Sequence, residues 1–382
     1  MGKEGHEMKV LFTCGGTAGH INPAIAAARL VKERHPEAEV LFVGAERGME
    51  NQLVPREGYD LRTVNIMRFQ RSISLFSLKY NLKTLYHLPA SRRQAKAILR
   101  EFQPDLVLGT GGYASYPVVR EAAKLHIPCA IHESNAVPGL TTKMLANVAD
   151  RILVGFEESR QYYKHPDRVV VTGTPVRGDF FELNRAQARA QLGITDEKPL
   201  VLSYFGSLGA RDMNRQMAEF MRLECKMEPF HHIHATGKAG YEWMPDHLKS
   251  LGVDLDAHPG VQMREYLYNM SVVMAAADVV ICRAGASTIS ELTALSKPAI
   301  LIPSPNVTGN HQEKNARVLE KRGAAMVFLE SESSGNLLFE ETYRLLTDPE
   351  RLRKMREAAG AVSAPDAAQR IYSVMIELMG KA

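Results

Sequence analysis

Residues Arg283 to Leu292, RAGASTISEL, lie between a run of apolar residues and a segment with helical periodicity. The apolar run, residues 279–282, is typical of a buried parallel strand, and small residues follow it. In doubly wound α/β proteins such a strand–turn–helix unit directs the first helical N–H groups at an anion. Alternatively, Thr288 and Glu291 form a capping box, which needs no ligand. With the motifs described below we favour nucleotide binding, in which Glu291 accepts hydrogen bonds from a ribose diol.

Size and composition indicate a soluble globular chain with two domains. The chain has 382 residues, more than one ordinary core needs, with 45% hydrophobic and 24% charged residues. Its four cysteines are far apart and form no CxxC pair, which favours reduced thiols over a zinc or redox site. Residues 1–7 are polar, and no apolar run reaches the roughly 18 residues of a membrane helix. Neither a secretory signal nor a spanning helix is therefore expected.

In the first half of the chain, three strand-like runs end in small or polar loops. The loops are Gly15–His20 (GGTAGH), Gly109–Ser115 and His132–Asn135. Because ligands of parallel sheets bind beyond the carboxyl ends of the strands, these loops are expected to share one crevice. The first loop lacks a complete GxGxxG and an acid at the end of the next strand, so no NAD site is predicted. A helix is expected from about Pro23.

The second half repeats this plan. We predict an N-terminal domain over residues 8–172, a linker over 173–185 and a C-terminal domain over 186–364. A final amphipathic helix, 365–380, is expected to pack back on the N-terminal domain. The predicted fold is α/β, with two Rossmann-like doubly wound domains that face each other across a cleft.

Positive charge is concentrated in residues 61–100, which hold nine Lys and Arg and no Asp or Glu, on a chain of net charge +4. Cations beside aliphatic and aromatic residues suit an anionic membrane surface, and the residues expected to contact it are Leu75, Phe76, Leu78, Lys79, Lys83, Arg92 and Arg93. The alternative is a solvated helix face whose apolar side packs inward. Nucleic acid is not expected, because the block is rich in Leu rather than in stacking aromatics.

Taken together, the motifs resemble those of the MurG family, peptidoglycan glycosyltransferases that move N-acetylglucosamine from UDP-GlcNAc to the lipid-linked muramoyl-pentapeptide, lipid I. The resemblance rests on GGTAGH at 15–20, GGY at 111–113, HESN at 132–135, GSLGAR at 206–211, RAGA at 283–286, Glu291 and HQEKN at 311–315. These motifs follow the family in order and spacing over nearly the whole chain. Ala18 and Phe205 depart from it, since the family usually has glycine at the first position and often at the second.

The resemblance implies a GT-B fold and an inverting transfer of GlcNAc to the C4 hydroxyl of MurNAc in lipid I, which gives lipid II at the cytoplasmic face of the membrane. His20 is the implied catalytic base, although it could instead cap the following helix, and His132 is the second choice. The donor-binding residues implied are Thr17, Ala18, Gly19, Asn135, Arg177, Ser207, Leu267, Ala286, Ser287, Thr288, Ile289, Ser290, Glu291, His311 and Gln312. The acceptor-side loops implied are Gly16, Gly111, Gly112, Tyr113, His132 and Glu133.

Within the donor set, Ser287, Ser207 and Arg177 are expected to hold the diphosphate. Glu291 would bind the ribose, and the backbone of Leu267 the uracil. His311 and Gln312 would contact the sugar hydroxyls, and Asn135 would reach the donor from the other domain.

No metal or other cofactor is expected. Residues 254–256 (DLD) match the DxD signature of metal-dependent transferases, but they lie away from the strand-end loops, and we interpret them as surface. Two other UDP-sugar enzymes of the GT-B class remain as alternatives, a diacylglycerol glycosyltransferase and a UDP-GlcNAc epimerase. A non-enzymatic nucleotide-sugar sensor is disfavoured, because it would leave His20 and the Gly-rich loops without a task.

Overall fold

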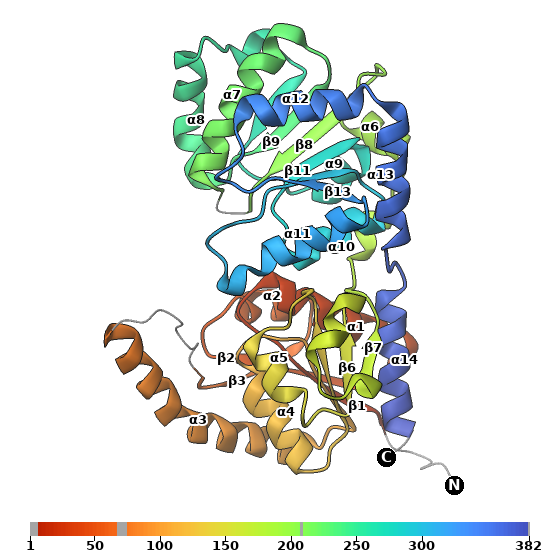
Figure 1. Cartoon of the computed structure of the whole chain (residues 1–382). Helices are drawn as coiled ribbons and strands as arrows, with labels where there is room; N and C mark the ends of the chain where they lie inside the picture. The colour runs from red at the N-terminus through yellow and green to blue at the C-terminus, as the bar shows by residue number, and fades with distance from the viewer. Residues whose placement is uncertain (1–6, 67–74, 207–208, 381–382) are drawn as a thin grey trace. The chain divides into compact units, whose positions relative to one another are not determined.

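The computed structural model describes residues 7–66, 75–206 and 209–380; the side chains of residues 75–87 and 308 lie outside this description. The chain divides into two compact units (Figure 1). Unit 1 comprises Met1–Val176 and Ala364–Ala382, and unit 2 comprises Arg177–Ser363. The division therefore falls inside the predicted linker, and the C-terminal segment belongs to unit 1.

Unit 1 is built on a parallel seven-stranded sheet of order β3-β2-β1-β4-β5-β6-β7. The strands are β1 (Lys9–Thr13), β2 (Glu39–Ala45), β3 (Asp60–Val64), β4 (Leu106–Gly109), β5 (Cys129–Glu133), β6 (Arg151–Val154) and β7 (Val169–Val171). Its helices are α1 (Ala18–Arg34), α2 (Glu50–Arg56), α3 (Leu75–Phe102), α4 (Ser115–Lys124), α5 (Leu140–Leu145) and α14 (Ala367–Gly380), with 3-10 turns η1 (Glu157–Tyr162) and η2 (Pro166–Arg168).

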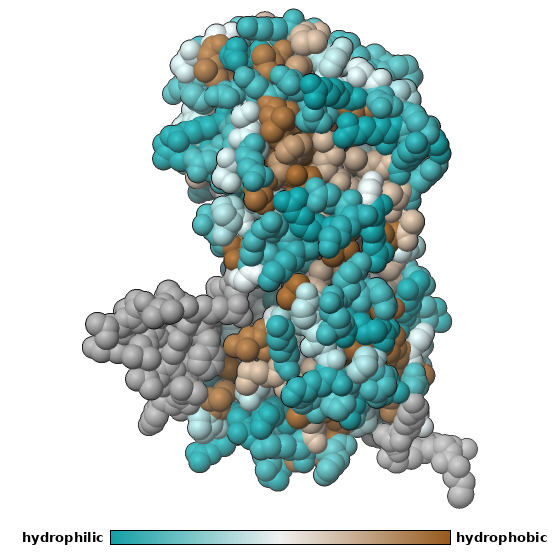
Figure 2. All heavy atoms as spheres, viewed as in Figure 1, coloured by the Kyte–Doolittle hydropathy of each residue, from teal (hydrophilic) through white to brown (hydrophobic). Residues whose placement is uncertain are grey.

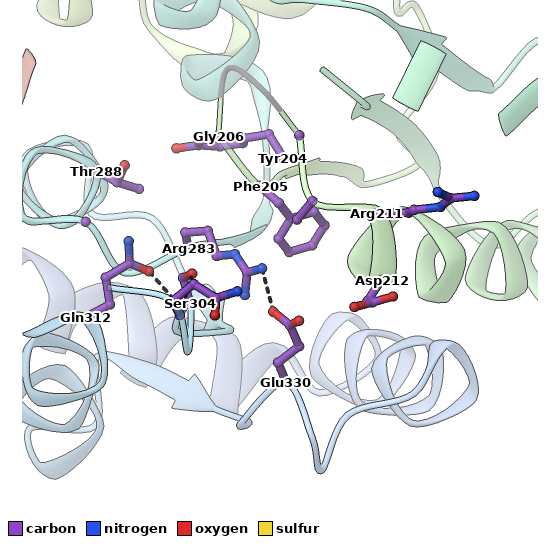
Figure 3. A pocket seen from close by; sticks show the side chains of 14 residues that line it. Tyr204, Phe205, Gly206, Arg211, Asp212, Arg283, Thr288, Ser304, Gln312 and Glu330 are labelled. Carbon is purple, nitrogen blue, oxygen red and sulfur yellow. Dashed lines mark hydrogen bonds and ion pairs between the residues drawn. The ribbon is translucent and has the colours of Figure 1, made fainter. Parts of the chain in front are cut away.

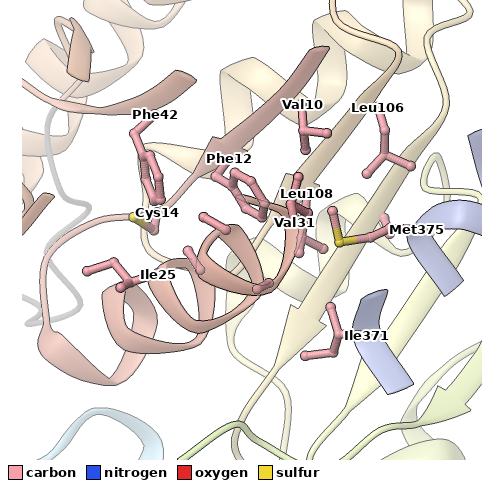
Figure 4. Close-up of a cluster of buried hydrophobic side chains, with 14 of the residues drawn as sticks. Val10, Phe12, Cys14, Ile25, Val31, Phe42, Leu106, Leu108, Ile371 and Met375 are labelled. Atoms are coloured by element: carbon pink, nitrogen blue, oxygen red, sulfur yellow. The ribbon is translucent and has the colours of Figure 1, made fainter. Parts of the chain in front are cut away.

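Both faces of this sheet are covered by apolar helix faces, as the continuous apolar sequence of its central strands requires. One face packs against α1 and α14, where Phe12 stacks on Phe42 at 5.3 Å between ring centroids and Ile371 and Met375 of α14 complete the cluster (Figure 4). The other face packs against α3, α4 and α5. The final helix is thus an integral part of the first core.

Unit 2 contains a parallel six-stranded sheet of order β10-β9-β8-β11-β12-β13. The strands are β8 (Leu200–Tyr204), β9 (His231–Ala235), β10 (Val261–Arg264), β11 (Val279–Cys282), β12 (Ala299–Leu301) and β13 (Ala325–Val327). Its helices are α6 (Arg185–Gln191), α7 (Arg211–Met227), α8 (Lys238–Ser250), α9 (Met270–Ala276), α10 (Ala286–Ala294), α11 (His311–Lys321), α12 (Gly335–Leu346) and α13 (Pro349–Ala361), with 3-10 turns η3 (Gly178–Phe181), η4 (Leu255–Ala257) and η5 (Thr308–Asn310). The outer faces of α11 and α13 are largely hydrophilic, as their charged sequences require (Figure 2).

One predicted boundary is wrong in a way that matters for the site. Helix α1 begins at Ala18 rather than near Pro23, which lies inside the helix. Proline is tolerated near a helix start because the first N–H groups have no intrahelical partner, but here it lies one turn further in. His20 consequently belongs to the first turn of α1 and not to the loop before it.

Most of the basic block lies in α3. Leu75, Phe76, Leu78, Lys79 and Lys83 have side chains outside the described part, so their membrane role stays a prediction. Among the described residues, none of the helices is both long and apolar enough to cross a membrane.

Two cations of the block, Arg62 and Arg92, are bound to acids that lie outside it. Arg62 makes a bidentate pair with Glu101, at 2.7 and 2.8 Å, and the Arg92 Nε atom donates to Glu121 at 2.6 Å. Arg93 is exposed. The charge of the block available to an anionic surface is therefore smaller than its sequence indicates.

Candidate functional site

Each sheet has a point where the chain reverses the direction in which it adds strands. In unit 1 this point lies between β1 and β4, and in unit 2 between β8 and β11. The loops that follow these strands leave in opposite directions, and the space between them is where doubly wound proteins bind ligands. The two Gly-rich motifs quoted from the sequence, which begin at Gly15 and Gly206, follow β1 and β8.

Unit 2 has a pocket of about 410 Å³ at this point (Figure 3). It is lined by Tyr204, Phe205, Gly206, Gly209, Ala210, Arg211, Asp212, Arg283, Gly285, Thr288, Ser304, Asn306, Gln312 and Glu330. Gly209 has a φ of +76°, and a Cβ there would lie 2.0 Å from the Thr236 carbonyl oxygen, so only glycine fits. Ser207, expected to hold the diphosphate, lies outside the described residues.

The N-terminus of α10 opens beside this pocket. Gly285 is the N-cap, and the first intrahelical bond is from the Ile289 amide to the Gly285 carbonyl at 2.9 Å. The amides of residues 286–288 precede that bond, as an anion site at a helix start requires. The Ser287 hydroxyl oxygen is buried without a hydrogen-bond partner among the described residues. A buried hydroxyl of this kind costs stability unless a ligand satisfies it.

The capping-box interpretation of Thr288 and Glu291 is wrong. Because the helix begins at Ala286, Thr288 is its third residue and Glu291 lies in its second turn. Glu291 is half-buried, and burial raises the pKa of its carboxyl to about 7, whereas the Arg177 guanidinium lowers the pKa and Asp179 raises it. An acid shifted in this way beside an anion-binding turn is a candidate functional group.

Arg283 holds the frame of the pocket. Its Nη1 donates to the carbonyls of Ile302 and Pro303 at 3.1 and 3.3 Å, and its Nη2 pairs with Glu330 at 2.5 Å. The guanidinium also lies over the Phe205 ring, 5.6 Å from its centroid (Figure 3). Phe205 thus fills space inside the pocket, and Arg283 fixes the ends of β11 and β12 instead of serving a ligand alone. Sequence reasoning missed Glu330, which no local motif marks.

The remaining predicted donor residues of unit 2 have more varied positions. Gln312 lines the pocket, and its Oε1 accepts from the Ser304 amide at 2.8 Å, which leaves the side-chain amide nitrogen for a ligand (Figure 3). His311 is the first residue of α11. Leu267 is 4% exposed, so its side chain is buried. The exposed Arg177 pairs with Asp179 at 3.1 Å.

In unit 1, the loops after β1 and β4 are packed together. A Cβ on Gly111 would lie 2.5 Å from the His20 Nδ1, and one on Gly112 would lie 2.2 Å from the Gly15 carbonyl oxygen. Thr110 donates its hydroxyl to the His20 carbonyl at 2.6 Å. His20, Gly111 and Gly112, all predicted site residues, are therefore brought together. Thr17 is the N-cap of α1 but makes no side-chain cap bond, so Ala18 and Gly19 begin the helix with open amides.

His132 and Glu133 are engaged within the protein. The His132 ring is 1% exposed, its Nε2 donates to the Gly173 carbonyl at 2.9 Å, and burial lowers its pKa. Glu133 accepts from the backbone and side-chain amides of Asn135, at 3.1 and 2.9 Å, and from the Gly139 amide at 2.9 Å. This geometry favours His20 over His132 as a base and gives Glu133 a loop-holding role.

Glu50 was not anticipated from the sequence. It is fully buried and accepts from the amides of Gly16 and Ala45, each at 3.0 Å. The Gly16 amide is thus occupied by Glu50 and is not open to a ligand. Only the cluster of glycines at 15, 44 and 48 could have indicated a buried side chain at this place.

The DLD segment has a local structural role. Asp254 is the N-cap of η4, and its carboxylate accepts from the Asp256 amide at 3.2 Å. Among the described residues, no group of three His, Cys, Asp or Glu side chains is arranged to hold a metal ion.

Both halves of the chain match one protein family. A model of the glycosyltransferase family 28 N-terminal domain matches residues 10–154, and the C-terminal domain of the same family matches residues 201–371. Curated proteins named UDP-N-acetylglucosamine–N-acetylmuramyl-(pentapeptide) pyrophosphoryl-undecaprenol N-acetylglucosamine transferase are similar over nearly their whole length. The protein from Acetivibrio thermocellus is 42% identical over 97% of this chain and 98% of its own, and that from Thermoanaerobacter sp. is 44% identical over 96% and 99%.

Solved structures agree on the fold. The crystal structure of MurG from Acinetobacter baumannii superposes with a TM-score of 0.77 at 24% identity, covering 97% of this chain and 99% of that one. A UDP-GlcNAc 2-epimerase from Neisseria meningitidis bound to UDP-GlcNAc gives a TM-score of 0.66 at 18% identity, covering 98% and 100%. The fold is thus GT-B. Because transferases and epimerases both have this fold, the family is assigned from the curated relatives, which are transferases. The chain belongs to glycosyltransferase family 28 and, within it, to the MurG family.

Proposed function

We propose that this protein transfers GlcNAc from UDP-GlcNAc to the C4 hydroxyl of MurNAc in lipid I and so makes lipid II. The observation that carries this proposal is the 42% identity, over 97% of the chain, to a curated transferase named for this reaction. The pocket at the β8–β11 reversal and the open N-terminus of α10 support the proposal that a nucleoside diphosphate binds in unit 2.

The donor would bind with its diphosphate at the first turn of α10. Three amides and the unsatisfied Ser287 hydroxyl would donate to phosphate oxygens, and the helix dipole adds about 0.3–1 kcal/mol for an anion at this position. Glu291 would accept from the ribose hydroxyls once it is ionised. The Gln312 amide nitrogen would donate to a sugar hydroxyl, because its oxygen is already bound to Ser304.

In the reaction, the acceptor C4 oxygen attacks the anomeric carbon, and the bond from that carbon to the β-phosphate oxygen of UDP breaks. A base must take the hydroxyl proton, and His20 is the proposed base. The negative charge that develops on UDP would be stabilised by the α10 amides and by Arg177. The proposed base and the groups that stabilise UDP all belong to this protein, and no step is assigned to a metal.

Lipid I is membrane-bound, so the proposed location is the cytoplasmic face of the cell membrane, with α3 in contact with anionic lipid. Arg93, Lys79 and Lys83 would supply charge, and Leu75, Phe76 and Leu78 apolar contact. No nucleic-acid partner is proposed.

The test is a transfer assay. Purified protein is incubated with UDP-GlcNAc labelled in the sugar, with and without a short-chain lipid I analogue, and label is followed in the lipid fraction. The proposal expects incorporation only with the analogue, with one UDP released per sugar transferred. Conversion of UDP-GlcNAc to its 2-epimer without acceptor, or transfer to diacylglycerol instead, would contradict it.

A further inference from the structure

The buried carboxylate of Glu50 joins two loops that are far apart in sequence. Glu50 is the first residue of α2, and its two oxygens accept from Gly16, after β1, and from Ala45, the last residue of β2. The side chain is 0% exposed. Both oxygens are bound to backbone amides, so the carboxylate acts on the positions of the loops.

Three glycines shape the space that Glu50 fills. A Cβ on Gly15 would lie 2.8 Å from its Oε1, one on Gly44 would lie 2.5 Å from its Cγ, and one on Gly48 would lie 2.2 Å from its Oε2. Any larger side chain at these positions would displace the carboxylate. The three glycines and the glutamate therefore pack together as one cluster, called the Glu50 cluster below.

The Glu50 cluster supports the first turn of α1. Gly16 has a φ of +89°, a conformation that residues other than glycine rarely adopt, and the Glu50 bond holds its amide in place. Thr17 and the first helical residues follow directly, and His20 lies in that first turn with its ring against Gly111. A shift of Gly16 would therefore move His20.

The Glu50 cluster also contacts the loop after β4. A Cβ on Gly112 would lie 2.2 Å from the Gly15 carbonyl oxygen, and the Tyr113 hydroxyl donates to the Arg47 carbonyl at 3.2 Å. Arg47 belongs to the β2–α2 loop that ends at Glu50. The loops after β1 and β4, which carry predicted acceptor-side residues, thus pack against each other and against the β2–α2 loop beside one buried acid.

We propose that Glu50 is a positioning residue of the transferase: it sets the geometry of the Gly15–Gly16 turn and, through it, of His20 and the Gly111–Tyr113 loop. The inference rests on the proposed function, in which His20 is the base. Glu50 does not touch either substrate. Loss of either amide bond would let the turn relax, and a displacement of about 1 Å at a catalytic group can reduce a rate by about 100-fold.

The experiment compares Glu50→Gln with Asp105→Asn. The control is matched, because the Asp105 carboxylate accepts from the Lys9 amide at 2.9 Å, at the opposite end of β1. Glu50→Gln keeps the size of the side chain but turns one acceptor into a donor that faces an amide. We expect kcat to fall about 100-fold, with the Kd for UDP within about twofold, since the diphosphate is proposed to bind at α10 in unit 2. Asp105→Asn should keep kcat within about twofold.

Hydrogen exchange gives the second readout. In Glu50→Gln, the peptide that contains Gly16 should exchange faster, while peptides from β4 and β5 keep the protection of the unmodified protein. Glu50→Asp retains the charge but is one methylene too short to reach both amides, and it should give an intermediate kcat. If Glu50→Gln does not fold, the kcat of Glu50→Asp tests the positioning role instead.

Two results would overturn the positioning role. One is a kcat of Glu50→Gln within about threefold of the unmodified enzyme. The other is an equal fall in kcat for both variants that follows only the folded fraction. Failure of the proposed function would look different, because the unmodified enzyme would then give no lipid-linked product.

Discussion

Replacing Glu291 with Gln should weaken UDP binding and stabilise the free protein, two effects of opposite sign. Glu291 lies in the second turn of α10, half-buried, near Arg177 and Asp179. Burial raises the pKa of its carboxyl to about 7. The protein therefore keeps a carboxylate where its charge is unfavourable, as a binding group for a ribose diol would require.

The magnitude of the binding effect follows from this pKa. With a pKa of about 7, roughly one tenth of Glu291 is ionised at pH 6 and roughly nine tenths at pH 8. If the ribose binds the ionised form, UDP affinity should rise about tenfold over this range, or about 1.4 kcal/mol. In Glu291→Gln that rise should vanish, and the affinity at pH 8 should be lower by about 1–3 kcal/mol.

The stability effect has the other sign. Because the pKa in the folded protein is above the ordinary value of 4.5, the contribution of Glu291 to stability is fully present below pH 4.5 and is lost as pH rises through 7. For a half-buried group the loss is roughly 1–3 kcal/mol. At pH 8, Glu291→Gln should therefore raise the Tm of unit 2 by a few degrees.

Calorimetric titration of UDP into both proteins at pH 6, 7 and 8 measures the first effect, and thermal unfolding at the same pH values measures the second. Because UDP itself also titrates in this pH range, the quantity to compare is the difference in UDP affinity between the unmodified protein and Glu291→Gln at each pH. Parallel pH profiles for UDP affinity, or a variant that melts lower and binds UDP normally, would refute the assignment of Glu291 to the ribose. Discrimination between UDP and 2′-deoxy-UDP should also shrink in the variant.

Three further predictions concern metal, membrane and acid stability. Transferase activity should be unchanged in excess EDTA and in Asp254→Ala, which removes only the cap of η4; restoration of a chelated enzyme by manganese or magnesium would overturn this. Arg93 and Lys96 are two cations of the basic block that lie in α3, and replacing both with Ser should weaken binding to anionic vesicles at low salt by about 1 kcal/mol per charge. Activity should fall on vesicle-embedded acceptor but not on a short-chain acceptor, whereas equal losses on both would assign α3 a purely structural role. His234 is fully buried, and burial lowers its pKa to about 3, below the ordinary 6.5, so its contribution to stability should be lost as pH falls below 6.5, by about 2 kcal/mol at pH 5. Because Glu291 titrates with the opposite sign, the test is the difference in unfolding free energy between the protein and His234→Gln; this difference should fall by about 2 kcal/mol from pH 7 to pH 5, and a difference independent of pH would contradict the prediction.

The fold was largely predictable because its signals are local. The apolar run of residues 279–282, the small-residue turn and the following periodicity mark one strand–turn–helix unit, and the same pattern recurs after β1 and β8. The final helix was expected to pack on the first domain, and Ile371 and Met375 lie in that core.

The site was less predictable where function depends on a boundary or on distant contacts. Helix starts are uncertain by a few residues in sequence reasoning, so Thr288–Glu291 resembled a capping box and His20 a loop residue. Glu50 lies 34 residues from Gly16, and Glu330 follows Arg283 by 47 residues, so no spacing rule joins either pair. Arg92 lies in a stretch of sequence without acidic residues, yet in the folded protein it forms an ion pair with Glu121.

The configuration of the product tests the central claim most directly. The disaccharide made from UDP-GlcNAc and a lipid I analogue can be isolated and its linkage read by NMR from the anomeric proton coupling and the carbon that bears the new bond. We expect a β linkage to C4 of MurNAc, since a single attack assisted by one base inverts the α-linked donor. An α linkage, or attachment at another hydroxyl, would contradict it.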